Sequence, residues 1–464
     1  MPIGSAPRLT DALARHAAER PTAPAVVDGA LVLTWAELAT QVVDHAARLM
    51  ARGVVVGDRV ALCAPDGAAA LIAALGAMHA GAIHAPIDHT LAPPEVVAAV
   101  AAIEATWIAD AAGALTRTDR ARIADPLAGE SAFIRCSSGT TGLAKGVLLS
   151  HATIIARCAA ANRGLGLVAG DRMLWMLPLA YHFAVSIGLY VQTGVTLVFG
   201  NALRASATAA IARAHAVTHA YTSPYHVRRL AALGAGDDLP PSLRFVVATT
   251  TALDAGAADA FRARHGVPVR QGLGIIEVGL PFVSPGGPGE PVGALGRPLP
   301  DYAVRILDQL GGPVRAGEAG ELAIAGPGLI DAYLQPWRQR AEILDDGCFR
   351  TGDVARVEAD GGVQLLGRAK DVINVGGVKV FPLEVEAVLD AHPKVAASRV
   401  RAGADARTGE HVHAEVELRP GNDPVAAPAE LAAWCAQRLA PLKRPAQIVV
   451  AAKLAMTGSG KVVR

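Results

Sequence analysis

Hydrophobic and polar positions change period repeatedly along the first half of the chain. Apolar residues spaced three and four apart predict a helix over 9–19, where Thr10 and Asp11 supply a start signal. Short apolar runs over 32–34 and 59–63 predict strands. The other expected elements are helices over about 36–52 and ending near residue 80, and strands over 195–199 and 244–247. Strands that alternate with helices predict an α/β fold with a mostly parallel sheet covered by helices.

The pattern changes near residues 367–371. Short strands follow, then a helix that begins at Pro382, since proline suits the first turn of a helix. A last helix is expected over about 429–439. The chain has 464 residues, too many for one ordinary core. We therefore predict an α/β protein with a large N-terminal domain of layered sheets and helices, residues 1–367, and a small mobile C-terminal α/β domain, residues 368–464.

Composition narrows the class of protein. Hydrophobic residues make up 52% of the chain and charged residues 18%, but no membrane-like apolar segment of about 20 residues occurs. The amino terminus lacks the basic start and apolar run of a signal peptide. The net charge is +1 and no long basic tract occurs, so nucleic acid is not an expected partner. We expect a cytoplasmic protein without a membrane span.

The cysteines give no sign of disulfides or zinc. They number five, are scattered and lack CxxC spacing, which fits a reducing compartment. We expect all five to be buried small apolar residues rather than nucleophiles.

A run of small and hydroxyl-bearing residues with one lysine occupies positions 137–146, between two apolar segments. Glycines let the backbone approach an anion, and hydroxyls and amides donate to phosphate oxygens. Lys145 can place a charge against a phosphate. The spacing is not that of a Walker loop, and a flexible linker is the alternative for this run taken alone. The candidate phosphate-binding residues are Ser137, Ser138, Gly139, Thr140, Thr141, Gly142 and Lys145.

This run resembles the phosphate loop of the adenylate-forming (AMP-binding) superfamily, which includes acyl-CoA synthetases, nonribosomal-peptide adenylation domains and luciferases. Motifs in the same order as in that superfamily extend from about residue 33 to residue 461. The resemblance implies an ATP-dependent, AMP-forming acid–thiol ligase. Such an enzyme uses ATP and Mg²⁺ to form an acyl-AMP and pyrophosphate, and then transfers the acyl group to CoA or to the phosphopantetheine of a carrier protein.

The segment 271–277 is similar to the superfamily's Gly, aromatic, Gly, variable, Thr, Glu run. The resemblance implies that Leu273 and Gly274 lie against the nucleotide and that Glu277 holds Mg²⁺, an ion that prefers oxygen ligands. Leu273 stands where the superfamily has an aromatic residue, and Ile276 stands where it has a threonine. Thr249 and Thr250 match the turn that lines the adenine pocket.

Three charged positions complete the implied nucleotide site. Asp353 resembles the aspartate that accepts hydrogen bonds from the ribose hydroxyls, a role suited to an ionised acceptor. Arg368 resembles the arginine that contacts the nucleotide. Lys461 resembles the terminal lysine that reaches the substrate carboxylate and the α-phosphate, where it stabilises developing charge. Taken alone, Asp353 could be a turn residue, and Lys461 could belong to a frayed basic terminus. The catalytic residues implied by the resemblance are Lys461, Lys145 and Glu277.

The resemblance also implies a domain rotation between two half-reactions. Lys370 stands where the superfamily has its hinge residue. Gly376 and Gly377 resemble the glycines beside the pantetheine channel, where a side chain would obstruct the thiol. The segment 79–88 resembles another superfamily motif and is expected to serve in packing.

The segment 178–186 corresponds to one wall of the acid pocket, with Tyr181, His182 and Ser186 as candidate residues, and Tyr225 is expected on the opposite wall. Adenylation domains for α-amino acids place an aspartate in this segment to pair with the ammonium group. None occurs between residues 175 and 200, so we expect an aliphatic or aryl acid without a free α-amine. His182 could instead be a core histidine.

Two other functions fit the same motifs. One is an amide-forming ligase in which an amine replaces the thiol. The other is a degenerate scaffold that binds nucleotide or acyl groups without turnover, as Ile276 and residues 249–251 would allow. The sequence leaves open whether the acceptor is CoA or a carrier protein, which would have to be a separate chain.

Overall fold

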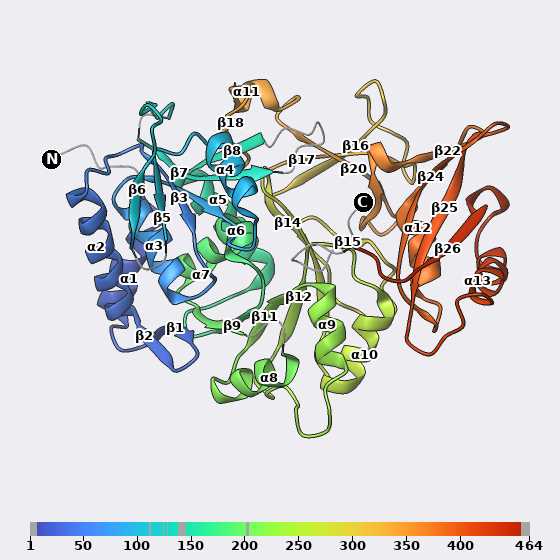
Figure 1. Cartoon of the computed structure of the whole chain (residues 1–464), viewed down its shortest axis with the longest axis horizontal. Helices are drawn as coiled ribbons and strands as arrows, with labels where there is room; N and C mark the ends of the chain where they lie inside the picture. The colour runs from blue at the N-terminus through green and yellow to red at the C-terminus, as the bar shows by residue number, and fades with distance from the viewer. Residues whose placement is uncertain are drawn as a thin grey trace.

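The computed structural model describes residues 7–110, 113–123, 125–127, 129–137, 145–200 and 204–455. Within these residues, mixed sheets and helices form a large N-terminal body and a smaller C-terminal one (Figure 1). The predicted α/β class with a large N-terminal and a small C-terminal domain is confirmed. The boundary at residue 367 stays a prediction.

One sheet of the large body has the strand order β14-β13-β12-β11-β9-β10-β1-β2. The strands from β13 to β1 pair in parallel, as alternating strands and helices predict, and the two edge strands pair antiparallel. The strands are β1 Pro24–Asp28, β2 Leu31–Thr34, β9 Arg172–Trp175, β10 Thr196–Phe199, β11 His219–Thr222, β12 Phe245–Ala248, β13 Val269–Ile275 and β14 Gly279–Val283.

A second sheet has the order β19-β18-β8-β7-β4-β3-β5-β6. Its central strands β7, β4, β3 and β5 are parallel, and β8 returns antiparallel to β7. The strands are β3 Arg59–Cys63, β4 Ile83–Ile87, β5 Trp107–Ala109, β6 Leu115–Arg117, β7 Ser131–Ser137, β8 Lys145–Ser150, β18 Ala332–Tyr333 and β19 Arg338–Gln339.

A third sheet is antiparallel and has the order β15-β21-β20-β17-β16. Its strands are β15 Ala294–Gly296, β16 Ala303–Leu307, β17 Gly320–Ala325, β20 Phe349–Val357 and β21 Val363–Arg368.

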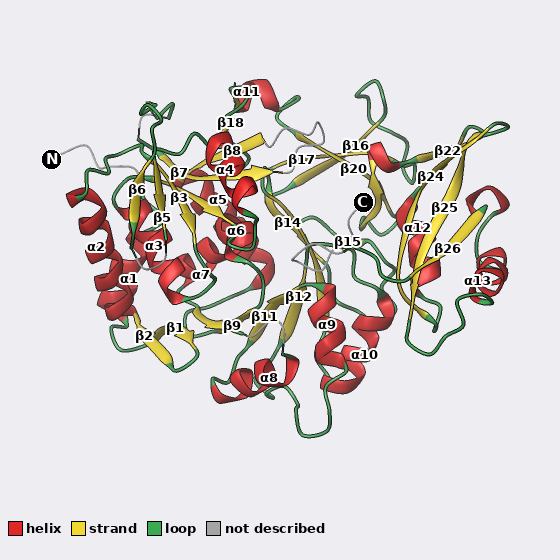
Figure 2. Cartoon of the chain, in the orientation of Figure 1, coloured by secondary structure: helices red, strands yellow, loops and turns green. Residues whose placement is uncertain are grey.

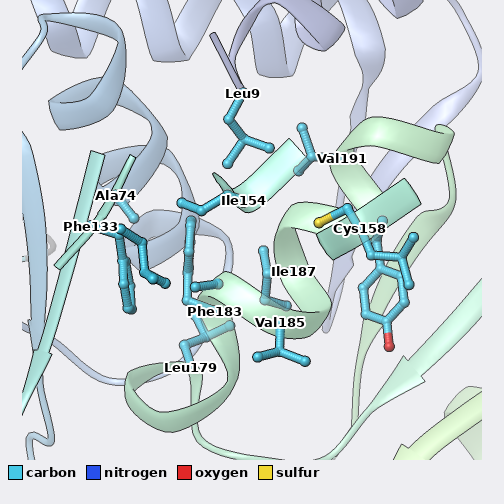
Figure 3. Packing of buried hydrophobic residues seen from close by; sticks show 14 of the residues in the cluster. Leu9, Ala74, Phe133, Ile154, Cys158, Leu179, Phe183, Val185, Ile187 and Val191 are labelled. Carbon is cyan, nitrogen blue, oxygen red and sulfur yellow. The ribbon is translucent and has the colours of Figure 1, made fainter. Parts of the chain in front are cut away.

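Helices of the large body pack their apolar faces onto these sheets. The main core includes Phe133 of β7, which stacks on Phe183 with 5.9 Å between ring centroids (Figure 3). The helices are α1 Asp11–Glu19, α2 Trp35–Ala51, α3 Ala68–His79, α4 Pro93–Ala102, α5 His151–Leu165, α6 Leu179–His182, a π-helical turn Phe183–Ile187, α7 Gly188–Thr193, α8 Ala205–Ala214, α9 Pro224–Ala231, α10 Ala255–His265 and α11 Arg340–Ile343.

The small body has its own sheet, β23-β22-β25-β24, with β26 parallel to β25. Helix α12 packs on β24 and helix α13 on β26 (Figure 2), and Val385, Leu389, Leu431 and Cys435 are buried between them. The elements are β22 Ile373–Val375, β23 Val378–Val380, α12 Pro382–Asp390, β24 Val395–Asp405, β25 Gly409–Leu418, α13 Ala427–Ala436 and β26 Gln447–Ala451.

The start of α12 at Pro382 agrees with the sequence, but α13 begins two residues earlier and ends three residues earlier than expected. Pro441 disfavours helical geometry at Ala440, but the end of the helix at Ala436 has no explanation in the structure.

Across the described ranges, no helix combines the length and the apolar character needed to cross a membrane.

The cysteines differ partly from expectation. Cys158, Cys348 and Cys435 are buried, whereas Cys63 and Cys136 are only half-buried because they lie near strand ends. Burial raises the pKa of Cys136 to about 11 and that of Cys158 to about 12. Neither thiol is therefore ionised enough at neutral pH to act as a nucleophile.

Candidate active site

The two ends of the predicted phosphate-binding run lie side by side. Ser137 at the end of β7 pairs with Lys145 at the start of β8 in an antiparallel register. The residues between them lie outside the described part of the chain, and so does Lys461. The roles of Lys461 and of the remaining candidate phosphate-binding residues stay predictions; those residues are Ser138, Gly139, Thr140, Thr141 and Gly142.

Glu277 lies in the turn between β13 and β14, and two contacts fix it. The Tyr333 hydroxyl donates to Oε1 of Glu277 at 3.0 Å, and the amide of Ile330 donates to the Glu277 carbonyl at 2.7 Å. Burial and the facing carboxylate raise the pKa of Tyr333, so this hydroxyl remains a donor. The carboxylate is half-buried and held in a defined position.

Arg157 on α5 supports the same turn, although the sequence analysis did not select it. It is 1% exposed, and its guanidinium donates to the carbonyl of Ile276 at 2.8 Å and from Nε to that of Gly328 at 3.0 Å. Burial lowers its pKa to about 10, which leaves it charged at neutral pH. The helix 151–165 has two arginines, and the signal was that Arg157, unlike the exposed Arg163, lies among its apolar positions.

The structure explains the isoleucine at position 276. Its side chain is 8% exposed and belongs to the main core, so it packs inward where the superfamily has a threonine. Leu273 is half-buried and Gly274 is exposed. These two residues therefore remain accessible to a nucleotide on the outer side of the same segment.

The site residues fit a magnesium ion that arrives with ATP. Glu277 accepts a hydrogen bond on one carboxylate oxygen, and the other has no hydrogen-bond donor among the described residues. Mg²⁺ is commonly held by one or two carboxylates together with substrate phosphates. That second oxygen is chemically suited to such an ion, and the metal role of Glu277 stays a prediction.

The turn after β12 is strained at Thr250. Its φ is +82°, a conformation that a β-branched residue rarely adopts. Its Oγ1 is buried and has no hydrogen-bond partner within the described residues, and the neighbouring Thr249 is 4% exposed. Strain of this kind collects at functional sites, and the role of this turn beside adenine stays a prediction.

Asp353 and Arg368 are paired with each other. They are register partners on β20 and β21, and Arg368 Nε lies 2.9 Å from Asp353 Oδ1. Arg368 also donates to the carbonyl of Thr351 at 3.0 Å. The aspartate is 5% exposed, so its carboxylate is a fixed acceptor that an arginine orients.

The predicted acid wall lies on α6 and the π-helical turn. The His182 ring is edge-on to Trp175 and Tyr221, with centroids 5.9 and 6.0 Å apart, and those two rings stack at 5.3 Å. Burial lowers the pKa of His182 to about 3, so the imidazole is neutral at physiological pH. Ser186 is buried beside the hydroxyls of Tyr190 and Tyr221.

Tyr181 is held from two sides. Its hydroxyl bonds to Asp88, and burial raises its pKa to about 12. Arg135 of β7 donates from Nη1 to the Tyr181 carbonyl at 2.8 Å, with its guanidinium carbon 5.2 Å from the ring centroid. Asp88 thus positions a residue of the acid wall in addition to the packing role expected for its segment. Arg135 was missed, although a charged residue inside the apolar run 132–136 marks it.

Tyr225 borders a groove of about 560 Å³ that opens along α8 and α9. Arg204, Arg228 and Arg229 also line it, and the Arg229 guanidinium lies 5.8 Å from the Tyr225 ring centroid. The tyrosine that contacts His182 is Tyr221, which the sequence did not indicate. The place of Tyr225 in the acid wall stays a prediction.

The predicted hinge and channel residues lie on the exposed side of the small body. Lys370 is exposed in a 3-10 turn, Ala369–Asp371. Gly376 and Gly377 form the turn between β22 and β23 with φ of +58° and +91°. A Cβ on Gly377 would meet no atom within 4 Å, so backbone conformation rather than crowding requires glycine in this arrangement.

Family models decide the classification. The AMP-binding enzyme model matches residues 13–334, and the AMP-binding enzyme C-terminal domain model matches residues 384–461. This chain belongs to the AMP-binding enzyme family. The resemblance to adenylate-forming enzymes is therefore confirmed.

Relatives of this AMP-binding enzyme act on different acids. A feruloyl-CoA synthase from Amycolatopsis sp is 32% identical over 97% of this chain and 96% of its own length. The o-succinylbenzoate CoA synthetase MenE from Bacillus subtilis, solved with its acyl-adenylate intermediate, is 25% identical with a TM-score of 0.85, covering 98% of this chain and 96% of its own. The amide bond synthetase McbA from Marinactinospora thermotolerans is 26% identical with a TM-score of 0.84, covering 98% of each chain.

Proposed function

We propose that this AMP-binding enzyme is an ATP-dependent acid–thiol ligase. One observation carries the proposal: Arg135 is near both groups. It donates a hydrogen bond to the carbonyl of Tyr181 in the predicted acid wall, and the Glu277 carboxylate is close enough to favour its charged form. The residues proposed to bind the metal and the acid are thus close to the same arginine. That arrangement is what attack of a carboxylate on the α-phosphate of MgATP requires.

The first half-reaction joins acid to AMP. A carboxylate oxygen attacks the α-phosphorus, the bond to the bridging oxygen breaks and pyrophosphate leaves. Thr140, Thr141 and Lys145 hold the phosphates, Asp353 binds the ribose and Lys461 stabilises the developing charge, as the resemblance implies. Mg²⁺, when bound, neutralises phosphate charge, and Glu277 supplies its protein oxygen.

The second half-reaction follows rotation of the small domain about Lys370. A thiol guided past Gly377 attacks the carbonyl carbon of the acyl-AMP, and AMP leaves with the electron pair of the broken bond. CoA is the proposed acceptor, supported by the relative named feruloyl-CoA synthase. An amine acceptor is the second candidate, supported by the likeness to an amide bond synthetase.

We further propose an aryl acid without an α-amine. The half-buried, neutral His182 lies edge-on to the buried, stacked rings of Trp175 and Tyr221, which makes this part of the wall aromatic and uncharged. No aspartate occurs between residues 175 and 200 to pair with an ammonium group.

Acid-dependent ATP–pyrophosphate exchange tests this function. The panel contains ferulate, indoleacetate, a medium-chain fatty acid and several α-amino acids, and Glu277→Ala is the control. We expect exchange with an aryl acid and its loss in the variant. Exchange with amino acids alone would overturn the assignment of the acid, and absence of exchange with every acid would overturn the ligase. Mass spectrometry after addition of CoA or an amine then identifies the acceptor.

A further inference from the structure

Arg135 is a positively charged residue to which no role in the reaction has been assigned above. It lies on β7, just before the phosphate-binding run, in a strand whose neighbours Phe133 and Ile134 are fully buried. A charged group is costly to hold in such surroundings unless it is paired. Its position therefore requires an explanation.

The guanidinium is incompletely satisfied. Nη1 donates to the Tyr181 carbonyl, but Nε is buried and has no hydrogen-bond partner among the described residues. The side chain as a whole is half-buried, as are those of Tyr181 and His182 beside it. These side chains lie deep in the molecule and still border accessible space, so a ligand can reach them.

The acidic groups nearby already have other partners. The Tyr181 hydroxyl bonds to Asp88, and Glu277 accepts from Tyr333 and makes no ion pair with Arg135 within the described residues. Arg135 thus donates to the Tyr181 carbonyl and lies within Coulombic reach of Glu277, but no ion pair within the described residues neutralises its charge. An anion that reaches Arg135 beside Tyr181 meets a guanidinium with an unpartnered Nε.

We propose that Arg135 binds the reacting carboxylate of the acid substrate and holds it for attack on the α-phosphate. The proposal rests on the ligase function above. Before the reaction, the acid is an anion that must approach the anionic triphosphate, and a fixed cation offsets that repulsion. After the reaction, the carboxyl group is a neutral mixed anhydride, so the ion pair exists in the first half-reaction only.

The test compares the two half-reactions in Arg135→Met and Arg135→Lys, with ferulate as the first acid. Arg117→Gln is the matched control, because Arg117 lies on the same sheet over an aromatic ring, Trp107, but is exposed. We expect the KM for the acid to rise about 10- to 100-fold in R135M, with a smaller rise in R135K and the KM for ATP unchanged. Conversion of preformed feruloyl-AMP and CoA to the thioester should change less than about threefold.

Binding measurements separate this inference from the ligase function. Ferulate and its neutral amide are titrated into each protein, which needs no turnover. We expect the wild type to prefer the acid over the amide and R135M to lose that preference. Equal loss in both half-reactions, a preference kept in R135M, or a rise in the KM for ATP instead would each overturn the role of Arg135. A wild type that binds ferulate in an Arg135-dependent manner but forms no adenylate would overturn the ligase function alone.

Discussion

The residues proposed to bind the nucleotide (the nucleotide side) and those proposed to bind the acid (the acid side) differ in how their charged groups are partnered. On the nucleotide side, Asp353 is paired with Arg368 at 2.9 Å, and Glu277 accepts from Tyr333 at 3.0 Å. On the acid side, His182 is half-buried and neutral, and Arg135 has an unpartnered Nε among the described residues. A ligand that binds Asp353 exchanges one polar contact for another, whereas a ligand that binds Arg135 supplies a missing one.

This difference predicts where discrimination occurs. A buried polar group without a partner costs about 1–3 kcal/mol, so a ligand that satisfies it gains more than one that replaces an existing hydrogen bond. We expect selectivity among acids to depend on a few acid-side residues. The nucleotide side should affect all acids equally.

The largest expected effect comes from removal of the Glu277 carboxylate. Glu277→Ala should lower the rate of adenylate formation about 100- to 1,000-fold, because charge on the phosphates is no longer stabilised through the metal. Tyr333→Phe keeps the carboxylate and should cost less than tenfold. Single-turnover pyrophosphate release measures both. An E277A effect that differs strongly between acids would break the comparison, because it would give the nucleotide side a role in acid choice.

A smaller effect is expected at Asp353. Asp353→Asn should raise the KM for ATP about tenfold, since a charge-assisted hydrogen bond to the ribose becomes a neutral one. The KM for the acid should not change. Steady-state kinetics with each substrate varied in turn checks this, and an unchanged KM for ATP would show that Asp353 serves the β20–β21 pairing alone.

On the acid side, His182→Phe should change the ratio of kcat/KM between two acids by about tenfold and leave the KM for ATP unchanged. Because the pKa of His182 is about 3, this residue should not titrate near pH 6.5. The pH profiles of kcat/KM for the acid should therefore have the same shape in the wild type and in H182F. A pH profile from 5.5 to 8 for both proteins tests it. A histidine-dependent step in that range would mean that His182 itself becomes charged near neutral pH.

The smallest effect concerns Asp390 on α12, which lies on neither side. Burial raises its pKa to about 7 from an ordinary 3.8, so the folded state keeps a proton that the unfolded state has lost between those values. Stability therefore falls as pH rises from about 4 to 7. Asp390→Asn should raise Tm by about 2–4 °C at pH 8 and by less at pH 5. An equal rise at both pH values would contradict the shifted pKa, and unchanged kinetics would confirm that the residue is remote from the reaction.

The sequence was informative where interactions are local. Alternating periods predicted the parallel sheet, and the run around Glu277 predicted a carboxylate that the structure fixes in a turn. The contact of Tyr221 with His182 and the bond from Tyr181 to Asp88 join segments that are far apart in the sequence, and no local pattern reports them. The inward position of Ile276 depends on the core behind it, which explains why its substitution for threonine could not be interpreted from spacing alone.

The neutral His182 has one more consequence, for the substrate itself. With the pKa of His182 at about 3 and that of Tyr181 at about 12, neither of these wall residues changes charge across the physiological pH range. The group that titrates is then the carboxylic acid, with a pKa of roughly 4 in water. The acid limb of activity should consequently shift from one substrate to the next and follow each molecule's own ionisation.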